Sequence, residues 1–99
     1  MNISIDGRLF EWDDEKAAIN WKKHKVTFDT AAKVFSDPNR LEEYDLYNSF
    51  YEDRWKVTGM VENILVVIYT DREDATRIIS ARKATTKERE DYYAGTKKD

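Results

Sequence analysis

The sequence of 99 residues contains no cysteine, a single histidine, one proline and three glycines. The absence of cysteine excludes disulfide bonds and thiolate metal sites. With only one histidine, the chain also cannot build a zinc finger, a multi-histidine metal centre or a Cys–His nucleophile pair. No glycine-rich loop is present that would hold a nucleotide. We therefore expect a protein without a metal ion or other cofactor.

Long apolar runs are also missing. The longest, residues 64–69, is far shorter than the ~18 residues that a membrane span needs. The N-terminus lacks the basic region and apolar stretch of a secretory signal, and a chain without cysteine suits a reducing compartment. We expect a cytoplasmic protein with no membrane contact. Chains usually divide into domains only well above this length, so a single domain over residues 1–99 is expected.

The charge of the chain is slightly acidic, with 20 Asp and Glu against 17 Lys and Arg and a net charge of −3. This balance argues against a simple nucleic-acid-binding protein. The distribution is uneven, however, because residues 1–75 carry an excess of acidic side chains and residues 76–99 an excess of basic ones. Binding depends on the local potential, so an acidic protein can still present a basic face.

Hydrophobic periodicity predicts helices in the first third of the chain. Residues 8–12 alternate as a short strand, after which Asp13 is placed to cap a helix that ends near His24. Thr27 is placed to cap a second, shorter helix, which the cluster around Pro38 ends. On the first helix, Ala17, Trp21, His24 and the following Phe28 are expected to share one side.

Beyond Pro38 the period changes to two, which predicts strands at residues 41–47, 50–60, 64–69 and 76–83. Short turns between them suggest an antiparallel meander. Thr85 and Glu88 form a capping box that begins a last helix, and Gly95 is expected to end it. The expected fold is α+β: two N-terminal helices, an antiparallel sheet of about four strands and a C-terminal helix.

Basic side chains in the second half are the first candidates for a functional site. Arginine forks on neighbouring strands can converge on a phosphodiester. Alternatively, these groups are solvated charges paired with nearby Asp and Glu. Arg82 follows the largely apolar residues 78–81, so its position should be well defined. The candidates are Arg54 and Lys56 on one strand face, Arg72 in the turn after the apolar strand, and Arg77, Arg82 and Lys83 on the last strand.

His24 and several aromatic residues complete the set. An unperturbed histidine has a pKa near 6.5, which suits proton transfer near neutrality, although His24 could equally be a half-buried residue that caps its helix. Tyr92 is well placed to stack on an unpaired base, with packing in the core or at its edge as the alternative. The apolar and aromatic residues of 41–51 could contribute to a partner surface or pack in the core.

Three stretches of the chain resemble the BrnT family of ribonuclease toxins from bacterial type II toxin–antitoxin systems. Together they span nearly the whole chain, and the third is the most specific. They comprise Phe10 to Asp13 with Lys16, Asn20, Lys23, His24, Val26 and Phe28; Ala32 with Val34, Phe35, Asp37 and Pro38; and residues 66–72 and 77–84 with Glu88, Arg89 and Tyr92. One departure is Lys25, which stands where the family commonly has a glycine.

The resemblance implies a RelE-like fold and RNA cleavage without a metal. It also implies neutralisation by a BrnA-like antitoxin, with operator DNA bound only through the antitoxin complex. On this reading His24 is the general base or acid, and Arg72 and Arg82, helped by Arg54, stabilise the charge on the phosphate. Lys23, Arg77 and Lys83 would position the RNA backbone, while Tyr92 would stack on a base or donate a proton.

Two other functions remain open at this point. One is a catalytically silent RelE-like module that only binds its protein partner, which the acidic balance favours. The other is a small nucleic-acid-binding regulator, which would bind in a salt-sensitive way without forming a product.

Overall fold

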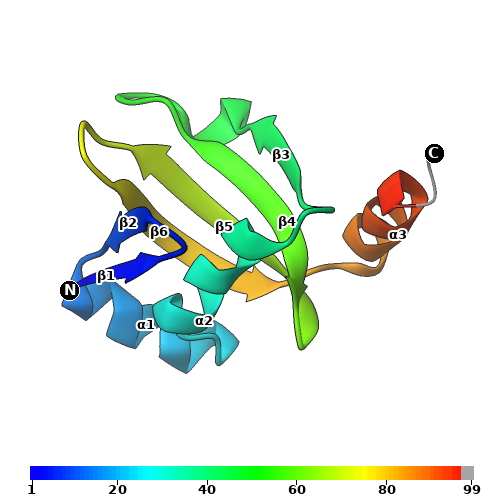
Figure 1. Cartoon of the computed structure of the whole chain (residues 1–99), viewed down its shortest axis with the longest axis horizontal. Coiled ribbons are helices and arrows are strands. Elements are labelled where there is room, and N and C mark those ends of the chain that lie inside the picture. Colours follow the sequence, from blue (N-terminus) through cyan, green and yellow to red (C-terminus); the bar gives the residue numbers. More distant parts are fainter. Residues whose placement is uncertain (97–99) are drawn as a thin grey trace.

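The computed structural model describes residues 1–96, which form a six-stranded sheet with three α-helices and two short 3₁₀-helices (Figure 1). The strands lie in the order β1-β2-β6-β5-β4-β3. All neighbouring strands are antiparallel except β2 and β6, which are parallel. The elements are β1 (Asn2–Ile5), β2 (Arg8–Glu11), α1 (Asp14–His24), α2 (Phe28–Ala32), η1 (Lys33–Ser36), β3 (Leu41–Tyr44), η2 (Leu46–Asn48), β4 (Trp55–Val61), β5 (Asn63–Asp71), β6 (Thr76–Lys83) and α3 (Thr86–Thr96).

The expected fold class, two N-terminal helices followed by four antiparallel strands, is therefore wrong. A hairpin of β1 and β2 precedes the helices, and the sheet is mixed because Phe10 and Glu11 of β2 pair in parallel with the start of β6. The hairpin turns at Asp6 and Gly7, whose φ angles of 51° and 82° match the Asp-Gly turns that suit a two-residue loop. The Asp-Gly dipeptide is a local signal for a hairpin, which hydrophobic periodicity does not detect.

Several local predictions are confirmed. Asp13 caps α1, since its carboxylate accepts the backbone N–H of Lys16 at 3.0 Å. At the start of α3, the backbone N–H of Thr85 donates to the Glu88 carboxylate at 2.8 Å and that of Glu88 donates to the Thr85 hydroxyl at 3.2 Å. The last strand has the predicted bounds, 76–83. Gly95 does not end α3, which continues to Thr96.

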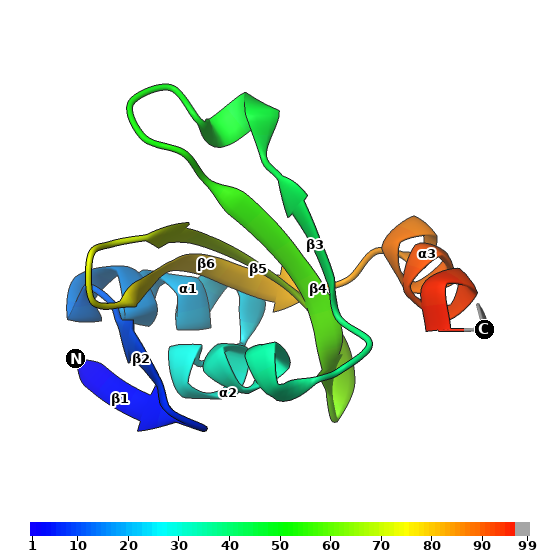
Figure 2. The ribbon, with the colours of Figure 1, turned by 45° about the horizontal axis from the view of Figure 1, so that its top comes forward.

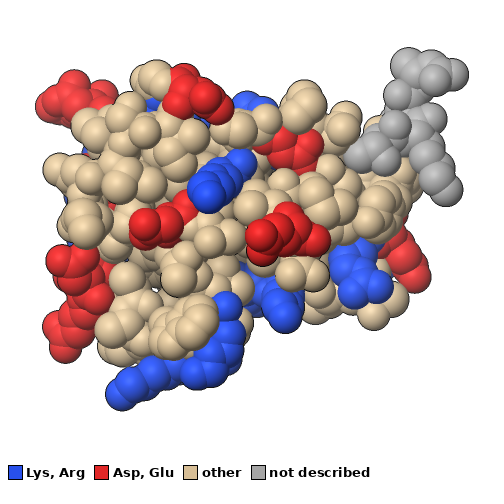
Figure 3. Space-filling model, turned by 60° about the horizontal axis from the view of Figure 1, so that its bottom comes forward, with Lys and Arg blue, Asp and Glu red and all other residues tan. Residues whose placement is uncertain are grey.

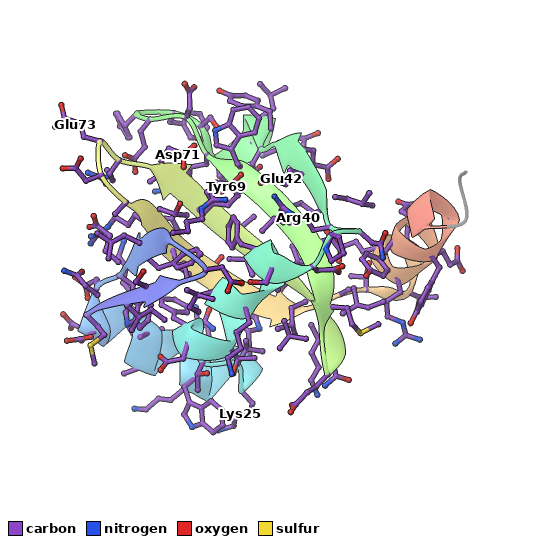
Figure 4. The ribbon with its side chains drawn as sticks, in the orientation of Figure 1. Lys25, Arg40, Glu42, Tyr69, Asp71 and Glu73 are labelled. Carbon is purple, nitrogen blue, oxygen red and sulfur yellow. The ribbon has the colours of Figure 1, made fainter. Side chains whose placement is uncertain are left out.

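The main core lies between one face of the sheet and the layer formed by α2 and η1 (Figure 2). Phe35 of η1 packs between Phe10 of β2 and Tyr69 of β5, with ring centroids 5.1 and 4.9 Å away. The Tyr69 hydroxyl donates to Glu42 at 2.8 Å, and Glu42 also lies 3.3 Å from Arg40 (Figure 4). Burial and this carboxylate raise the pKa of Tyr69 well above its usual range, so the hydroxyl remains protonated.

The inward face of α1 differs from the expected one. Trp21 and His24 are exposed, and the buried residue of α1 is Asn20. Its amide nitrogen donates to the carbonyls of Ala81, at 2.8 Å, and Val26, at 3.0 Å, while its oxygen accepts the Ala81 N–H at 3.1 Å. Because β2 pairs only with Thr76 and Arg77 of β6, the Asn20 side chain takes the place of a neighbouring strand farther along.

The C-cap of α1 is Lys25, which adopts the left-handed conformation with φ 57° and donates its N–H to the Trp21 carbonyl. A side chain is strained there, whereas glycine is not. We expect Lys25→Gly to raise the free energy of unfolding by about 0.5 kcal/mol. This is a net gain, because the relief of strain is partly offset by the loss of the exposed contact between the Lys25 ammonium and the Trp21 ring.

Urea denaturation would measure this effect, with Lys25→Ala as the control, because alanine loses the ring contact but keeps the strain. Figure 4 shows that Lys25 lies away from the other labelled side chains. A glycine variant no more stable than the alanine variant would contradict the prediction.

Candidate functional site

The second face of the sheet carries the polar side chains that line a site. The register places Lys56, Ile68 and Ser80 in one row across β4, β5 and β6, and Thr58, Val66 and Arg82 in the next. α3 reaches this face near β3 and β4, where Glu88 contacts Lys56 and Gly95 lies against Leu41. The part of this face beside β6 is left open.

A cleft of about 490 Å³ lies over this open part of the sheet. Its floor comes from the three central strands, and its walls from the last residue of α1 and from the segment around η2. The left-handed turn at Lys25 ends α1 at His24 and leaves that side chain on the rim. The lining residues are His24, Asp45, Tyr47, Asn48, Lys56, Ile68, Ser80, Ala81 and Arg82.

A smaller groove of about 210 Å³ adjoins the cleft and shares His24 and Ser80 with it. Lys16 and Lys23 of α1 line this groove, and their spacing of seven residues puts both on one side of the helix. The opposite wall includes Ile79, at the position where the pairing of β5 and β6 shifts register. Such bulges re-aim side chains next to functional sites. Groove and cleft together present basic side chains from α1, β4 and β6.

The two cations of the cleft share the carboxylate of Glu88 in the first turn of α3, and Lys56 also lies 3.4 Å from Glu43. The Arg82 guanidinium binds it through two N–H groups, at 2.7 and 3.0 Å, and the Lys56 ammonium lies 2.8 Å from it. The Arg82 hydrogen bonds hold the pKa of Glu88 far below its usual range, despite burial, which opposes this shift. Burial lowers the pKa of Lys56, but its contacts with Glu88 and Glu43 together outweigh this and raise it. All three groups therefore stay charged at neutral pH.

Arg54, Arg72 and Arg77 lie outside the cleft. Arg54 and Arg72 share a different carboxylate, Glu52, at 3.9 and 3.2 Å. Arg77 pairs with Glu11 of β2 at 2.6 Å. For these three residues the structure shows the pairing with neighbouring carboxylates that was the alternative in the sequence analysis.

Two further candidates also lie elsewhere. Lys83 lines a separate pocket with Trp21 and Lys25. Tyr92 is buried, and its hydroxyl donates to Asp37 at 2.6 Å. Burial and this carboxylate raise the pKa of Tyr92 to about 12. Of the eight residues that were given a role in the sequence analysis, the structure thus brings His24 and Arg82 into the cleft and Lys23 into the adjoining groove.

Sequence reasoning did not give Lys56 a role at the site, although it noted that Lys56 shares a strand face with Arg54. The strand alternation showed the face, but only the register with β5 and β6 places Lys56 in one row with Ser80, across Ile68. Asp45 and Tyr47 were missed because residues 41–47 were expected to be a strand throughout, whereas β3 ends at Tyr44. Nothing in the local sequence predicts that these two residues lie over the sheet.

Within residues 1–96, no three His, Asp or Glu side chains gather in a way that would hold a metal ion. None of the helices in this part of the chain combines the length and apolar character needed to span a bilayer. On the side that carries α1 and α2, basic and acidic side chains are interspersed (Figure 3). That side therefore carries no large patch of side chains of one charge.

Comparisons with known proteins agree with this architecture. The crystal structure of the ribonuclease toxin BrnT from Brucella abortus superposes with a TM-score of 0.58, covering 78% of this chain and 96% of that chain, at 23% sequence identity. Among curated proteins there is no match. The family model described as "Ribonuclease toxin, BrnT, of type II toxin-antitoxin system" matches residues 12–88. Because this match spans most of the sequence, the chain belongs to the BrnT family of ribonuclease toxins from type II toxin–antitoxin systems.

Proposed function

We propose that this protein is a metal-independent endoribonuclease and that the cleft over β4, β5 and β6 is its reacting centre. The observation that carries the proposal is that His24, Lys56 and Arg82, from three separate elements, line one cleft. A titratable imidazole beside two fixed cations is suited to cleaving a phosphodiester. The family description, a ribonuclease toxin, supports the same reaction.

The reaction we propose is an attack of the ribose 2′-oxygen on the adjacent phosphorus. The 2′-hydroxyl loses its proton, a bond forms between that oxygen and phosphorus, and the bond from phosphorus to the 5′-oxygen breaks. The 5′-oxygen takes up a proton, which leaves a 2′,3′-cyclic phosphate and a 5′-hydroxyl. His24 serves as the base or the acid, and Asp45 and Tyr47 are the other proton-transfer groups on the cleft wall.

Arg82 and Lys56 would stabilise the negative charge that grows on the phosphate oxygens. Arginine carries five N–H donors, and Glu88 engages one from each terminal nitrogen of Arg82, so donors remain for a substrate. The Glu88 contact also fixes the guanidinium in one orientation before RNA binds. Lys16 and Lys23 in the adjoining groove would position the backbone of the RNA.

Membership of a type II toxin–antitoxin family implies an antitoxin partner. We propose that this antitoxin is BrnA-like and that operator DNA is bound only through the complex of the two proteins. A catalytically silent binding module is the second candidate. The observation that favours it is that both cations of the cleft are already paired with Glu88.

The purified protein, incubated with RNA in the presence of EDTA, tests the proposal. We expect cleavage by the wild type and a rate lower by ~10²–10⁴-fold for His24→Gln, because the imidazole can no longer transfer a proton. Lys33→Gln, which removes an exposed cation remote from the cleft, is the control and should cleave normally. Wild-type protein that binds its antitoxin but leaves RNA intact would support the silent module instead.

A further inference from the structure

The connection between β3 and β4, residues 45–54, presents large apolar side chains to solvent; we call it the arm. Figure 2 shows it extending beyond the end of the sheet. The exposed fractions of its four large apolar side chains are 75% for Leu46, 87% for Tyr47, 85% for Phe50 and 103% for Tyr51. These residues therefore do not pack in the core, and a contiguous group of this kind is typical of an interaction site.

Polar groups hold the arm in shape from its inner side. The Ser49 hydroxyl donates to the Asp45 carbonyl at 2.7 Å and accepts the Arg54 N–H at 2.9 Å. The Asp45 N–H donates to the Arg54 carbonyl at 2.9 Å, and the Asn48 amide donates to the Asp45 carboxylate at 2.7 Å. The arm thus places polar groups inside and apolar groups outside. Exposing these apolar side chains to water costs free energy, and their burial against a partner would recover it.

The charge of this region indicates the chemistry of the partner. Between residues 41 and 53 the chain has no Lys or Arg, and the cations that pair with its carboxylates come from outside this stretch. With five carboxylates and no cation of its own, this stretch favours basic protein segments over the phosphates of RNA. Exposed tyrosine and phenylalanine side chains are common anchors of protein interfaces. The acidic residues are Glu42, Glu43, Asp45, Glu52 and Asp53.

The arm also borders the cleft. Asp45, Tyr47 and Asn48 line the same cleft as His24 and Arg82. Phe50 and Tyr51 line a smaller pocket of about 270 Å³, which shares Asn48 with the cleft. A protein segment seated on Phe50 and Tyr51 would therefore cover Tyr47 and restrict access to the cleft.

We infer that the arm is the docking surface for the antitoxin, through a segment whose apolar side chains contact the arm's aromatic residues and whose Lys or Arg side chains meet its carboxylates. Neutralisation then follows from obstruction of the cleft, a step that rests on the proposed function. The binding itself does not depend on catalysis.

The test uses the double variant Phe50→Ser/Tyr51→Ser and the protein encoded by the reading frame adjacent to the gene of this chain. Both side chains are exposed and lie outside the cleft, so folding and RNA cleavage should persist. We expect calorimetry to give a Kd for the antitoxin raised by on the order of 10²-fold, and we expect the variant to keep cleaving RNA when antitoxin is added. Asp53→Lys should weaken binding most at low salt.

Trp21→Ser is the matched control, because it removes an exposed aromatic ring from α1 and should leave the Kd unchanged. Two results would overturn the inference: an unchanged Kd for the double variant, or no binding of the adjacent gene product by the wild type. Loss of affinity for single-stranded RNA with intact antitoxin binding would assign the arm to RNA instead. If the double variant loses antitoxin binding but wild-type protein cleaves no RNA, the docking surface stands and the proposed function fails.

Discussion

Replacing Arg82 with alanine should lower the rate of RNA cleavage by ~10²–10³-fold, the usual cost of removing one preorganised charge donor. Arg82 emerges from the buried part of β6, and Glu88 fixes its guanidinium through two hydrogen bonds. In the proposed reaction it would therefore meet the phosphate without reorganisation. Single-turnover cleavage of a short RNA would measure the effect. Arg82→Lys should retain part of the activity, because lysine keeps the charge but lacks the planar fork.

The alanine variant leaves the largely buried Glu88 without its principal partner, so a loss of folding must be separated from a loss of chemistry. The double variant Arg82→Ala/Glu88→Gln removes the charge of both groups and should fold while remaining inactive. Arg89→Ala, which removes an exposed arginine from α3, should cleave at the wild-type rate. A folded Arg82→Ala protein with normal activity would exclude Arg82 from the reacting centre.

Replacing Asn20 with alanine should lower the free energy of unfolding by about 3 kcal/mol, because it strands buried backbone groups that each cost ~1–3 kcal/mol when unpaired. These groups are the N–H and C=O of Ala81 and the C=O of Val26. Urea denaturation would measure the loss. Asn39→Ala is the control, since the exposed Asn39 bonds to Asp37 through its backbone N–H and should lose little stability. A loss below about 1 kcal/mol for Asn20→Ala would show that water replaces the amide.

Asn20 also connects the two halves of the cleft. Its side chain ties α1 to Ala81, the residue directly before Arg82, and α1 ends one turn later at His24. The distance between the imidazole and the guanidinium therefore depends on this amide. Asn20 appeared in the family resemblance, and the structure supplies a physical reason for an asparagine there: one amide both donates and accepts, as a neighbouring strand would.

The net acidic charge of the chain argued against RNA binding. The structure shows where the acidic side chains lie, which the composition could not. Glu11, Glu52 and Glu88 each pair with arginines and so lie among the cations. Glu11 and Glu88 thus hold arginines in place. The carboxylates of β3 and of the arm give the surface that we propose for the antitoxin its acidic character.

What the sequence determined by itself is local. The cap at Asp13, the capping box of Thr85 and Glu88 and the bounds of β6 depend on hydrogen bonds and periodicity within a few residues, and all are present. The three stretches that resemble the BrnT family also lie in the sequence, and the match of the family model to residues 12–88 confirms the family.

Tertiary structure alone decided which distant groups meet. The parallel pairing of β2 with β6, the inward turn of Asn20 and the row of Lys56 and Ser80 all join segments far apart in the chain. Tertiary packing also places Arg82 in the cleft, whereas Arg54, Arg72 and Arg77 pair with carboxylates outside it. Strand register and helix rotation are set by the packing of the whole core, and no short-range pattern encodes them.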